Sequence, residues 1–265
     1  MKYGVIIRNV TDLRAEPKFQ SERKSQLLFD EPILVDRNQD GYLFIHQGDN
    51  YSGWADERAV NILSRENYEL ICNRLNYQVM TATCPITPAE KGKRIPPFLF
   101  YGTKLHLVEK SGNKGIIITG RNQRVQAAMR NLAPVPDPDK AIIRPAGIIK
   151  EARKFLGTPY LWGGVTPFGF DCSGLVQMVY RALGLNLPRD SKDQRNRGTK
   201  IDVGQIEMGD LLFFKGHVAI AIDRYKLIHS SLGAGGVAMN SLNPRDQDYR
   251  KDLTEIFIEA RRVLK

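Results

Sequence analysis

Cys172 lies where a glycine-marked turn gives way to an apolar segment, in the run Phe170-Asp171-Cys172-Ser173-Gly174-Leu175. From Leu175 to Leu183 the apolar residues recur at helical spacing and Gly184 follows as a stop signal, so the sequence predicts a buried helix that begins near Cys172. In the first turn of a helix, unpaired backbone N–H groups and the helix dipole favour a thiolate, the reactive form of cysteine. Cys172 is therefore a candidate nucleophile, although a small buried hydrophobic residue would also fit this position.

Two of the four histidines could serve as the base that a cysteine nucleophile needs. His217 opens an apolar run that ends at Ile222, and His229 closes a second short run that begins at Lys226. Both runs are typical of strands joined by a tight turn. If the hairpin is centred on Asp223, the two histidines face each other across one side of the sheet. One imidazole could then contact the thiol while the other orients it, whereas two unrelated strand histidines are the alternative.

Residues 141–265 resemble the NlpC-type peptidases, papain-like cysteine enzymes that cut the peptide stems of bacterial cell walls. The resemblance depends on six motifs in the family's order and spacing: Gly157-Thr158-Pro159-Tyr160-Leu161-Trp162-Gly163-Gly164, Phe170-Asp171-Cys172-Ser173-Gly174-Leu175, Leu187-Pro188-Arg189-Asp190-Ser191, Gly209-Asp210-Leu211, Gly216-His217-Val218-Ala219-Ile220 and His229. It implies that Cys172 is the nucleophile, His217 the base and His229 the residue that orients it. It also implies that the Tyr160 hydroxyl and the backbone N–H of Cys172 stabilise the oxyanion. From the residues alone, Tyr160 is as well explained as a packed aromatic side chain.

The cysteine content and the N-terminus favour a reducing compartment. Three cysteines cannot all pair, and Cys72 and Cys84 have no histidine neighbours at metal-ligand spacing, so we expect no disulfide framework, no metal and no cofactor. The first residues lack the pattern of a secretory signal, and no apolar stretch is long enough to span a membrane. We therefore expect a soluble, cytoplasmic protein.

The chain is basic, with a formal net charge of +10 and a pI of about 9.5, which raises the question of nucleic-acid binding. The densest basic cluster follows the predicted helix and contains Arg189, Lys192, Arg195, Arg197 and Lys200. It could be a solvated loop or could attract a polyanionic substrate. No nucleic-acid-binding motif accompanies it, so nucleic acid is not an expected partner.

The chain of 265 residues is long enough for a catalytic unit and two small domains before it. The alternate prolines after Ala133 predict a linker over residues 134–140. Upstream, short alternating runs around Ile33–Val35 and Tyr42–Ile45 have the spacing of a small antiparallel barrel, and residues 1–65 resemble bacterial SH3-like domains. A weaker second copy is expected over residues 66–133. The predicted fold is thus an α+β papain-like catalytic domain at residues 141–265 preceded by two small all-β SH3-like barrels.

This arrangement resembles a narrower group, the γ-D-glutamyl-diamino-acid endopeptidases of the YkfC type. In that group the first barrel closes one end of the cleft, where a free L-alanine amine is bound. The resemblance implies an amine pocket with residues from both parts of the chain: Asp171, Ser173, Asp190 and Ser191 from the catalytic domain, and Glu31 and Tyr51 from the barrel. A desolvated ammonium needs carboxylates and hydroxyls around it, which agrees with these residue types. Alternatively, Asp171 is a helix cap and Glu31 an exposed charge at a strand edge.

The resulting hypothesis is a cysteine peptidase that hydrolyses the γ-D-glutamyl bond to meso-diaminopimelate or L-lysine in murein stem peptides with a free N-terminal L-alanine. Its expected role is the recycling of released wall peptides. One alternative is a secreted hydrolase of intact peptidoglycan whose barrels anchor it to the wall. Another is a wall-fragment binding protein with an inactive peptidase domain. The preferred diamino acid and the oligomeric state do not follow from the sequence.

Overall fold

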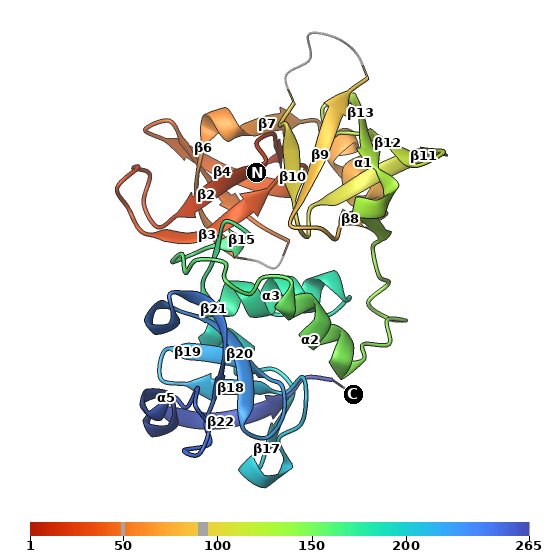
Figure 1. Cartoon of the computed structure of the whole chain (residues 1–265). Helices are drawn as coiled ribbons and strands as arrows, with labels where there is room; N and C mark the ends of the chain where they lie inside the picture. The colour runs from red at the N-terminus through yellow and green to blue at the C-terminus, as the bar shows by residue number, and fades with distance from the viewer. Residues whose placement is uncertain (49–50, 90–94, 265) are drawn as a thin grey trace. The chain divides into compact units, whose positions relative to one another are not determined.

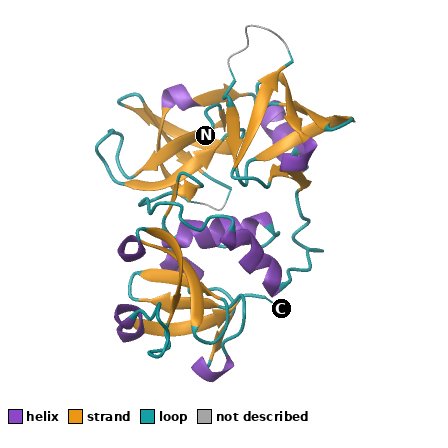
Figure 2. Ribbon diagram, in the orientation of Figure 1, coloured by secondary structure: helices purple, strands orange, loops and turns teal. Residues whose placement is uncertain are grey.

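The computed structural model describes residues 1–48, 51–89 and 95–264, which form two compact units, Met1–Val135 and Pro136–Lys265. The first unit consists almost entirely of strands and the second combines helices with a sheet (Figures 1 and 2). The boundary between the units falls within the predicted proline-rich linker.

The first unit begins with a seven-stranded antiparallel sheet of order β3-β2-β6-β5-β4-β1-β7. Its strands are β1 (Lys2–Ile6), β2 (Val10–Arg14), β3 (Arg23–Leu28), β4 (Pro32–Gln39), β5 (Tyr42–His46), β6 (Ser52–Asp56) and β7 (Val60–Leu63), with a short 3-10 turn η1 (Glu57–Ala59) before β7. The strands alternate buried apolar and exposed polar residues, so one face forms a core. Asp40 and Gly41 both have positive φ and connect β4 to β5 as a tight two-residue hairpin turn.

A second seven-stranded sheet repeats the first, with order β10-β9-β13-β12-β11-β8-β14. Its strands are β8 (Tyr77–Val79), β9 (Thr83–Pro88), β10 (Phe98–Phe100), β11 (Lys104–Ser111), β12 (Lys114–Ile118), β13 (Arg124–Ala128) and β14 (Leu132–Pro134), with η2 (Met129–Asn131) before β14 and the helix α1 (Arg65–Arg74) before β8. Each strand of the second sheet occupies the position that the strand numbered seven lower has in the first sheet. The β4–β5 pair and the β11–β12 pair each have a register shift, at corresponding positions. The two sheets therefore share one topology, and their likeness to SH3-like domains stays a prediction.

The connection between β3 and β4 joins the two sheets of this unit. Phe29 packs into the core of the second sheet, and the Asp30 carboxylate accepts a hydrogen bond of 3.0 Å from the backbone N–H of Gly120. Asp30 is buried and has a φ of 56°, a left-handed conformation that aspartate and asparagine tolerate better than most residues. Burial raises the pKa of the Asp30 carboxyl to about 7, against the opposing effect of the Gly120 hydrogen bond.

We expect Asp30→Asn to remove a pH dependence of stability. Between about pH 4 and about pH 7 the folded protein keeps a proton that the unfolded chain has released, so the free energy of unfolding falls as the pH rises through this window. The fall amounts to at most roughly 4 kcal/mol. Asparagine keeps the acceptor and the backbone conformation without the titration. Urea unfolding at about pH 4.5 and about pH 7.5 measures the effect, with the half-exposed Asp36→Asn as control. An unchanged slope in Asp30→Asn would contradict the assignment.

The second unit is an α+β fold with a six-stranded antiparallel sheet of order β17-β22-β18-β19-β20-β21. Its elements in chain order are α2 (Pro145–Arg153), β15 (Val165–Thr166), β16 (Gly169–Phe170), α3 (Cys172–Ala182), α4 (Ser191–Gln194), β17 (Thr199–Ile201), η3 (Val203–Gln205), β18 (Leu211–Phe214), β19 (His217–Ala221), β20 (Lys226–Ser231), η4 (Leu232–Ala234), β21 (Gly236–Ser241), α5 (Lys251–Glu255) and β22 (Phe257–Arg262). Helices α2 and α3 pack against each other, and both contact β20.

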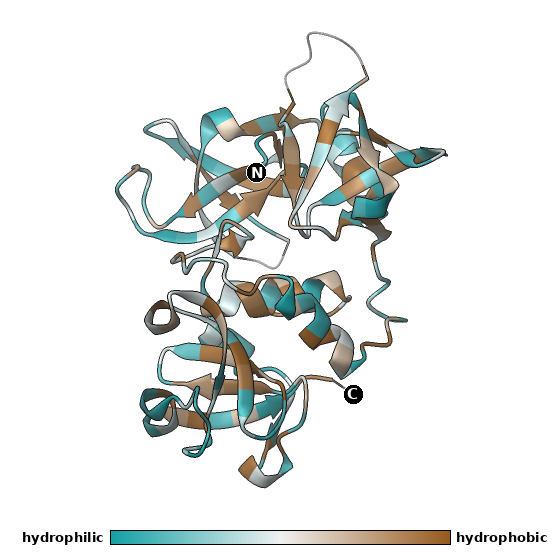
Figure 3. Cartoon of the chain, in the orientation of Figure 1, coloured by the Kyte–Doolittle hydropathy of each residue, from teal (hydrophilic) through white to brown (hydrophobic). Residues whose placement is uncertain are grey.

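Helix α3 is the predicted apolar helix, and its predicted start and stop are confirmed. It begins at Cys172, with Asp171 as N-cap, and ends before Gly184, which has a φ of 102°. Nearly all of its side chains are buried, and Figure 3 shows hydrophobic residues along α3 and β18. The helix is thus fixed on the sheet, so that its first turn is held against the start of β19. Within the described ranges, no helix is long and apolar enough to cross a membrane.

Candidate active site

The nucleophile candidate is the first residue of α3 and is 8% exposed. The chain before it is drawn close to the helix, because the backbone N–H of Asp171 donates to the Gly164 carbonyl and that carbonyl lies against Gly174. A Cβ at position 174 would lie 2.2 Å from the Gly164 oxygen, so only glycine permits this approach. The Ser230 hydroxyl also donates to the Phe170 carbonyl at 2.6 Å. These contacts fix the turn on which the Cys172 thiol sits.

The Asp171 carboxylate is the centre of a buried network beneath this turn. It accepts backbone hydrogen bonds from Gly174 at 2.6 Å and Gly163 at 2.9 Å. The two terminal nitrogens of the Arg189 guanidinium, Nη2 and Nη1, donate to it at 2.6 and 3.1 Å, and the Ser173 hydroxyl donates to it at 3.3 Å. Arg189 also donates to the Ser173 hydroxyl at 2.9 Å. The aspartate, the serine and the arginine are all buried, so the network holds the nucleophile turn from inside.

This network bears on two expectations from the sequence. Arg189 was grouped with a basic surface cluster, but it is 3% exposed and neutralises Asp171. Asp171 and Ser173 were expected in an amine pocket, but their oxygens already have partners inside the domain. Asp171 is the N-cap of α3 and pairs with Arg189, and its part in an amine pocket, like that of Ser173, stays a prediction. Arg195 and Lys200, from the same predicted cluster, form ion pairs with Glu259.

The two histidines meet as predicted, although the predicted register is wrong. The Nε2 atom of His217 lies 2.8 Å from the Nδ1 atom of His229. Strands β19 and β20 pair Ile220 with Ile228, which centres the hairpin one residue beyond Asp223. The imidazoles are consequently diagonal neighbours on one face of the sheet rather than directly opposed. The hairpin is centred there because the Asp223 carboxylate accepts the backbone N–H groups of Tyr225 and Lys226 and closes the turn.

Asn240 continues this chain of hydrogen bonds. Its Oδ1 atom lies 2.9 Å from the Nε2 atom of His229, and its Nδ2 atom donates to the Asp248 carbonyl at 3.3 Å. Burial lowers the pKa of both imidazoles, and the nearby Arg250 guanidinium acts in the same direction. Both histidines are therefore neutral near pH 7, which is the state required of a general base.

The thiol lies beside this pair, because the backbone N–H of Val218, the residue after His217, donates to Cys172. Burial raises the pKa of the Cys172 thiol to about 11, and the charge of Asp171 adds to the rise. The N–H groups of Val218 and Ser173 and the charge of Arg189 oppose it without cancelling it. Burial thus acts against the thiolate that the helix terminus favours. A base that accepts the thiol proton is therefore needed as sulfur attacks.

Tyr160 belongs to the same site. Its ring is half-buried, and Cys172 and Asp171 both act electrostatically on its hydroxyl. Burial raises the pKa of Tyr160 to about 12, so the phenol stays protonated and can donate a hydrogen bond at neutral pH. Its strand-like bridge to Phe170 places it beside the residue that precedes Asp171. The arrangement is one that could stabilise an oxyanion formed next to Cys172.

The remaining predicted residues belong to different units. Asp190 and Ser191 follow Arg189 directly and are half-buried at the start of α4. Glu31 and Tyr51 belong to the first unit, where the Glu31 carboxylate accepts hydrogen bonds from the Leu28 backbone and the Gln47 side chain, both at 2.9 Å. Tyr51 lies under an ammonium group, with Lys24 Nζ 4.8 Å from its ring centre. Their part in an amine pocket stays a prediction.

Three residues that contact the site were missed from the sequence: Arg189, Ser230 and Asn240. Arg189 stands inside a matched motif, so the pairing of its charge with the acid of the cysteine motif was a usable signal. Ser230 and Asn240 had no such signal, because their roles depend on the register of β20 and β21, which pairs His229 with Ala238.

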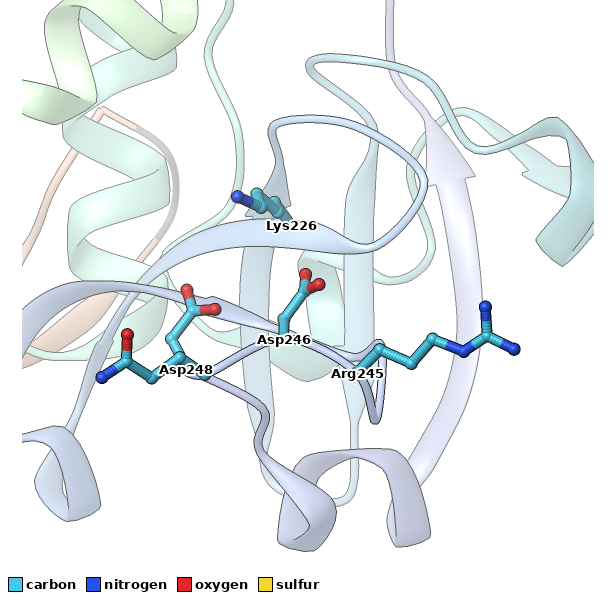
Figure 4. A pocket seen from close by; sticks show the side chains of 5 residues that line it. Lys226, Arg245, Asp246 and Asp248 are labelled. Carbon is cyan, nitrogen blue, oxygen red and sulfur yellow. The ribbon is translucent and has the colours of Figure 1, made fainter.

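A polar pocket of about 670 Å³ lies at the start of β20 (Figure 4). It is lined by Lys226, Arg245, Asp246, Gln247 and Asp248. It does not include the thiol or the imidazoles. Among the residues that the structure describes, no group of three histidine, cysteine, aspartate or glutamate side chains could hold a metal ion.

Comparison with known proteins identifies the family that the second unit matches. Residues 157–255 match the NlpC/P60 family. Dipeptidyl-peptidase 6 of Lysinibacillus sphaericus is 27% identical over 94% of this chain and 95% of its own length. Gamma-D-glutamyl-L-lysine dipeptidyl-peptidase of Bacillus cereus is 29% identical over 82% of this chain and 69% of its own length. The sequence similarity thus extends from the second unit into the first.

Among solved structures, an NlpC/P60 family protein from Bacillus cereus matches the whole chain. The match covers 100% of both chains with a TM-score of 0.89 and 22% sequence identity. At this identity the match shows the fold, and it supports the predicted papain-like α+β arrangement of the second unit.

Proposed function

Because this chain belongs to the NlpC/P60 family and is a cysteine-type hydrolase, we propose that it cleaves the γ-D-glutamyl bond to the diamino acid in peptidoglycan stem peptides. The observation that carries the proposal is the buried Cys172 thiol, which accepts the backbone N–H of Val218 directly after His217, together with the His217–His229 contact. The choice of bond is supported by the relative named for γ-D-glutamyl-L-lysine. L-lysine and meso-diaminopimelate are both proposed as the diamino acid, since both present an α-amine as leaving group.

In the proposed reaction, Cys172 Sγ attacks the γ-carbonyl carbon while the neutral His217 imidazole accepts the thiol proton. The carbonyl oxygen takes the negative charge, and the Tyr160 hydroxyl and the backbone N–H of Cys172 donate to it. His217 then gives its proton to the α-amine of the diamino acid as the C–N bond breaks. Water hydrolyses the resulting thioester and restores the thiol. His229 holds His217 throughout by the 2.8 Å contact.

We also propose that the enzyme requires a free N-terminal L-alanine amine. Because Arg189 already pairs with Asp171, we assign most of the charge that faces the ammonium to Asp190 in the second unit and Glu31 in the first. Asp171 and Ser173 are proposed as further acceptors. Tyr51 and Ser191 are proposed as hydroxyl partners. The names of the two relatives as dipeptidyl-peptidases support the proposal, because such enzymes release a dipeptide from a free N-terminus.

Free L-Ala-γ-D-Glu-L-Lys should be cleaved far faster than its N-acetylated counterpart. The acetyl group removes the charge of the amine and leaves a carboxylate without a partner, and breaking such a pair costs roughly 3–5 kcal/mol. At about 1.4 kcal/mol per tenfold, kcat/KM should fall by roughly two to four orders of magnitude. Glu31→Gln should narrow the gap between the two peptides, whereas Glu16→Gln, an exposed acid in the same unit, should leave it unchanged.

Equal kcat/KM for the free and blocked peptides would refute the amine pocket and favour the alternative of a secreted hydrolase that acts on intact wall. Turnover of neither peptide, with retained binding of both, would favour the wall-fragment binding protein. A preference for free amines would suit the recycling of released peptides, and we propose this role and a cytoplasmic location together. Cell fractionation with an antibody against the chain tests the location.

A further inference from the structure

We propose that Asn240 is a positioning residue that fixes the tautomers of both imidazoles and thereby makes Nδ1 of His217 the basic nitrogen. The inference rests on the proposed function for its catalytic meaning, but its geometry stands apart from any substrate. It starts at the Asp248 carbonyl, which can only accept hydrogen bonds. That carbonyl takes the backbone N–H of Ser241 at 3.0 Å and the Asn240 amide nitrogen at 3.3 Å.

The orientation of the Asn240 amide follows from this contact. Its NH₂ group must face the Asp248 carbonyl, so its oxygen must face the Nε2 atom of His229, at 2.9 Å. An amide oxygen only accepts, and therefore Nε2 of His229 carries the proton. Because burial keeps this imidazole neutral, its Nδ1 atom has the lone pair.

The tautomer of His217 follows from that of His229. Its Nε2 atom lies 2.8 Å from Nδ1 of His229, which has the lone pair, so Nε2 of His217 must be the donor. In the neutral ring the Nδ1 atom of His217 is then unprotonated and can take the thiol proton. Without the Asn240 amide, His229 could adopt the other tautomer, with the proton on Nδ1 and the lone pair on Nε2. The Nε2–H group of His217 would then have no acceptor in His229. A wrong tautomer of a triad histidine can cost about 10⁴ in kcat, and Asn240 acts one residue further away.

The segment that holds the amide is tied down independently of the imidazoles. The Asp246 carboxylate accepts hydrogen bonds from the Ser241 hydroxyl at 2.7 Å and from the Asn243 amide at 3.2 Å. Asp246 and Asp248 also line the polar pocket of Figure 4. Arg250 ends the segment and forms an ion pair with Asp252. The charges of Arg250 and Asp252 act on both imidazoles, and His229 also acts on His217.

Nitrogen NMR of the histidine-labelled full-length protein tests the tautomers directly and requires no substrate. The expected result is a protonated Nε2 and an unprotonated Nδ1 in both His217 and His229. A protonated Nδ1 in either ring would overturn the inference, whether or not the proposed peptide is cleaved.

The kinetic test uses the free-amine peptide with two substitutions of Asn240, a His229→Ala background and a control. Asn240→Leu should lower kcat by about 10- to 100-fold, and in a His229→Ala background it should add less than about twofold, because its effect passes through His229. Asn240→Asp keeps the acceptor and adds a negative charge that raises the imidazole pKa. This variant should retain turnover, while the acid limb of the pH profile of kcat/KM moves to higher pH. Gln247→Ala, at an exposed side chain of the same segment, is the control and should match the wild type.

Equal losses from Asn240→Leu in the wild-type and His229→Ala backgrounds would show that Asn240 acts on its surroundings rather than through His229. An unshifted acid limb in Asn240→Asp would contradict the inference as well. Thermal melting of each variant identifies a folding defect, and the NMR result for the wild type decides the matter if Asn240→Leu does not fold.

Discussion

Cys172→Ala is expected to lower kcat by roughly four to six orders of magnitude, the scale on which nucleophiles of catalytic triads act. The side chain supplies the only atom that bonds to the substrate in the proposed reaction, and no neighbouring group can replace it. The loss of one sulfur from a buried first-turn position should leave the fold intact. Steady-state release of lysine measures the change, and circular dichroism checks the fold. Cys72→Ala, an exposed cysteine of the first unit, is the matched control and should have wild-type activity.

The same assay ranks the two histidines. His217→Ala should approach the loss seen in Cys172→Ala, since the thiol with a pKa of about 11 cannot lose its proton without a base. His229→Ala should retain more activity, because it removes only the residue that orients the base. The reverse ranking would mean that the two roles are exchanged, and wild-type activity in all three variants would remove the site from consideration.

The second large effect concerns stability. Arg189→Met should lower the free energy of unfolding by roughly 3–5 kcal/mol, because it leaves the buried Asp171 carboxylate without its charged partner. Arg195→Met removes a guanidinium from an ion pair whose arginine is 42% exposed, and should cost no more than about 1 kcal/mol. Urea unfolding of the two variants gives the comparison.

A second substitution separates the ion pair from simple loss of volume. In Asp171→Asn the carboxylate charge is gone, so adding Arg189→Met should cost less than it does in the wild type. Equal losses for Arg189→Met and Arg195→Met would contradict the view that the buried pair supports the nucleophile turn.

The sequence predicted best what depends on local pattern. The apolar period after Leu175, the cap before it and the glycine at 184 were enough to predict α3, and the alternating runs predicted β4 and β5. Cys172, His217 and His229 were found because their motifs are short and ordered.

The remainder depended on register and on burial, neither of which the sequence states. The β19–β20 hairpin was predicted one residue out because the Asp223 side chain closes the turn. Arg189 was read as a surface charge because its partner lies 18 residues earlier. The thiolate was expected because the helix terminus is visible in the sequence, whereas the burial that acts against it is a tertiary property.

The most direct test of the central claim is the mass spectrum of products from free L-Ala-γ-D-Glu-L-Lys incubated with the wild-type chain and with Cys172→Ala. The account predicts L-Ala-D-Glu and free lysine in the first sample and intact peptide in the second. Cleavage between alanine and D-glutamate, or the same products from Cys172→Ala, would contradict it.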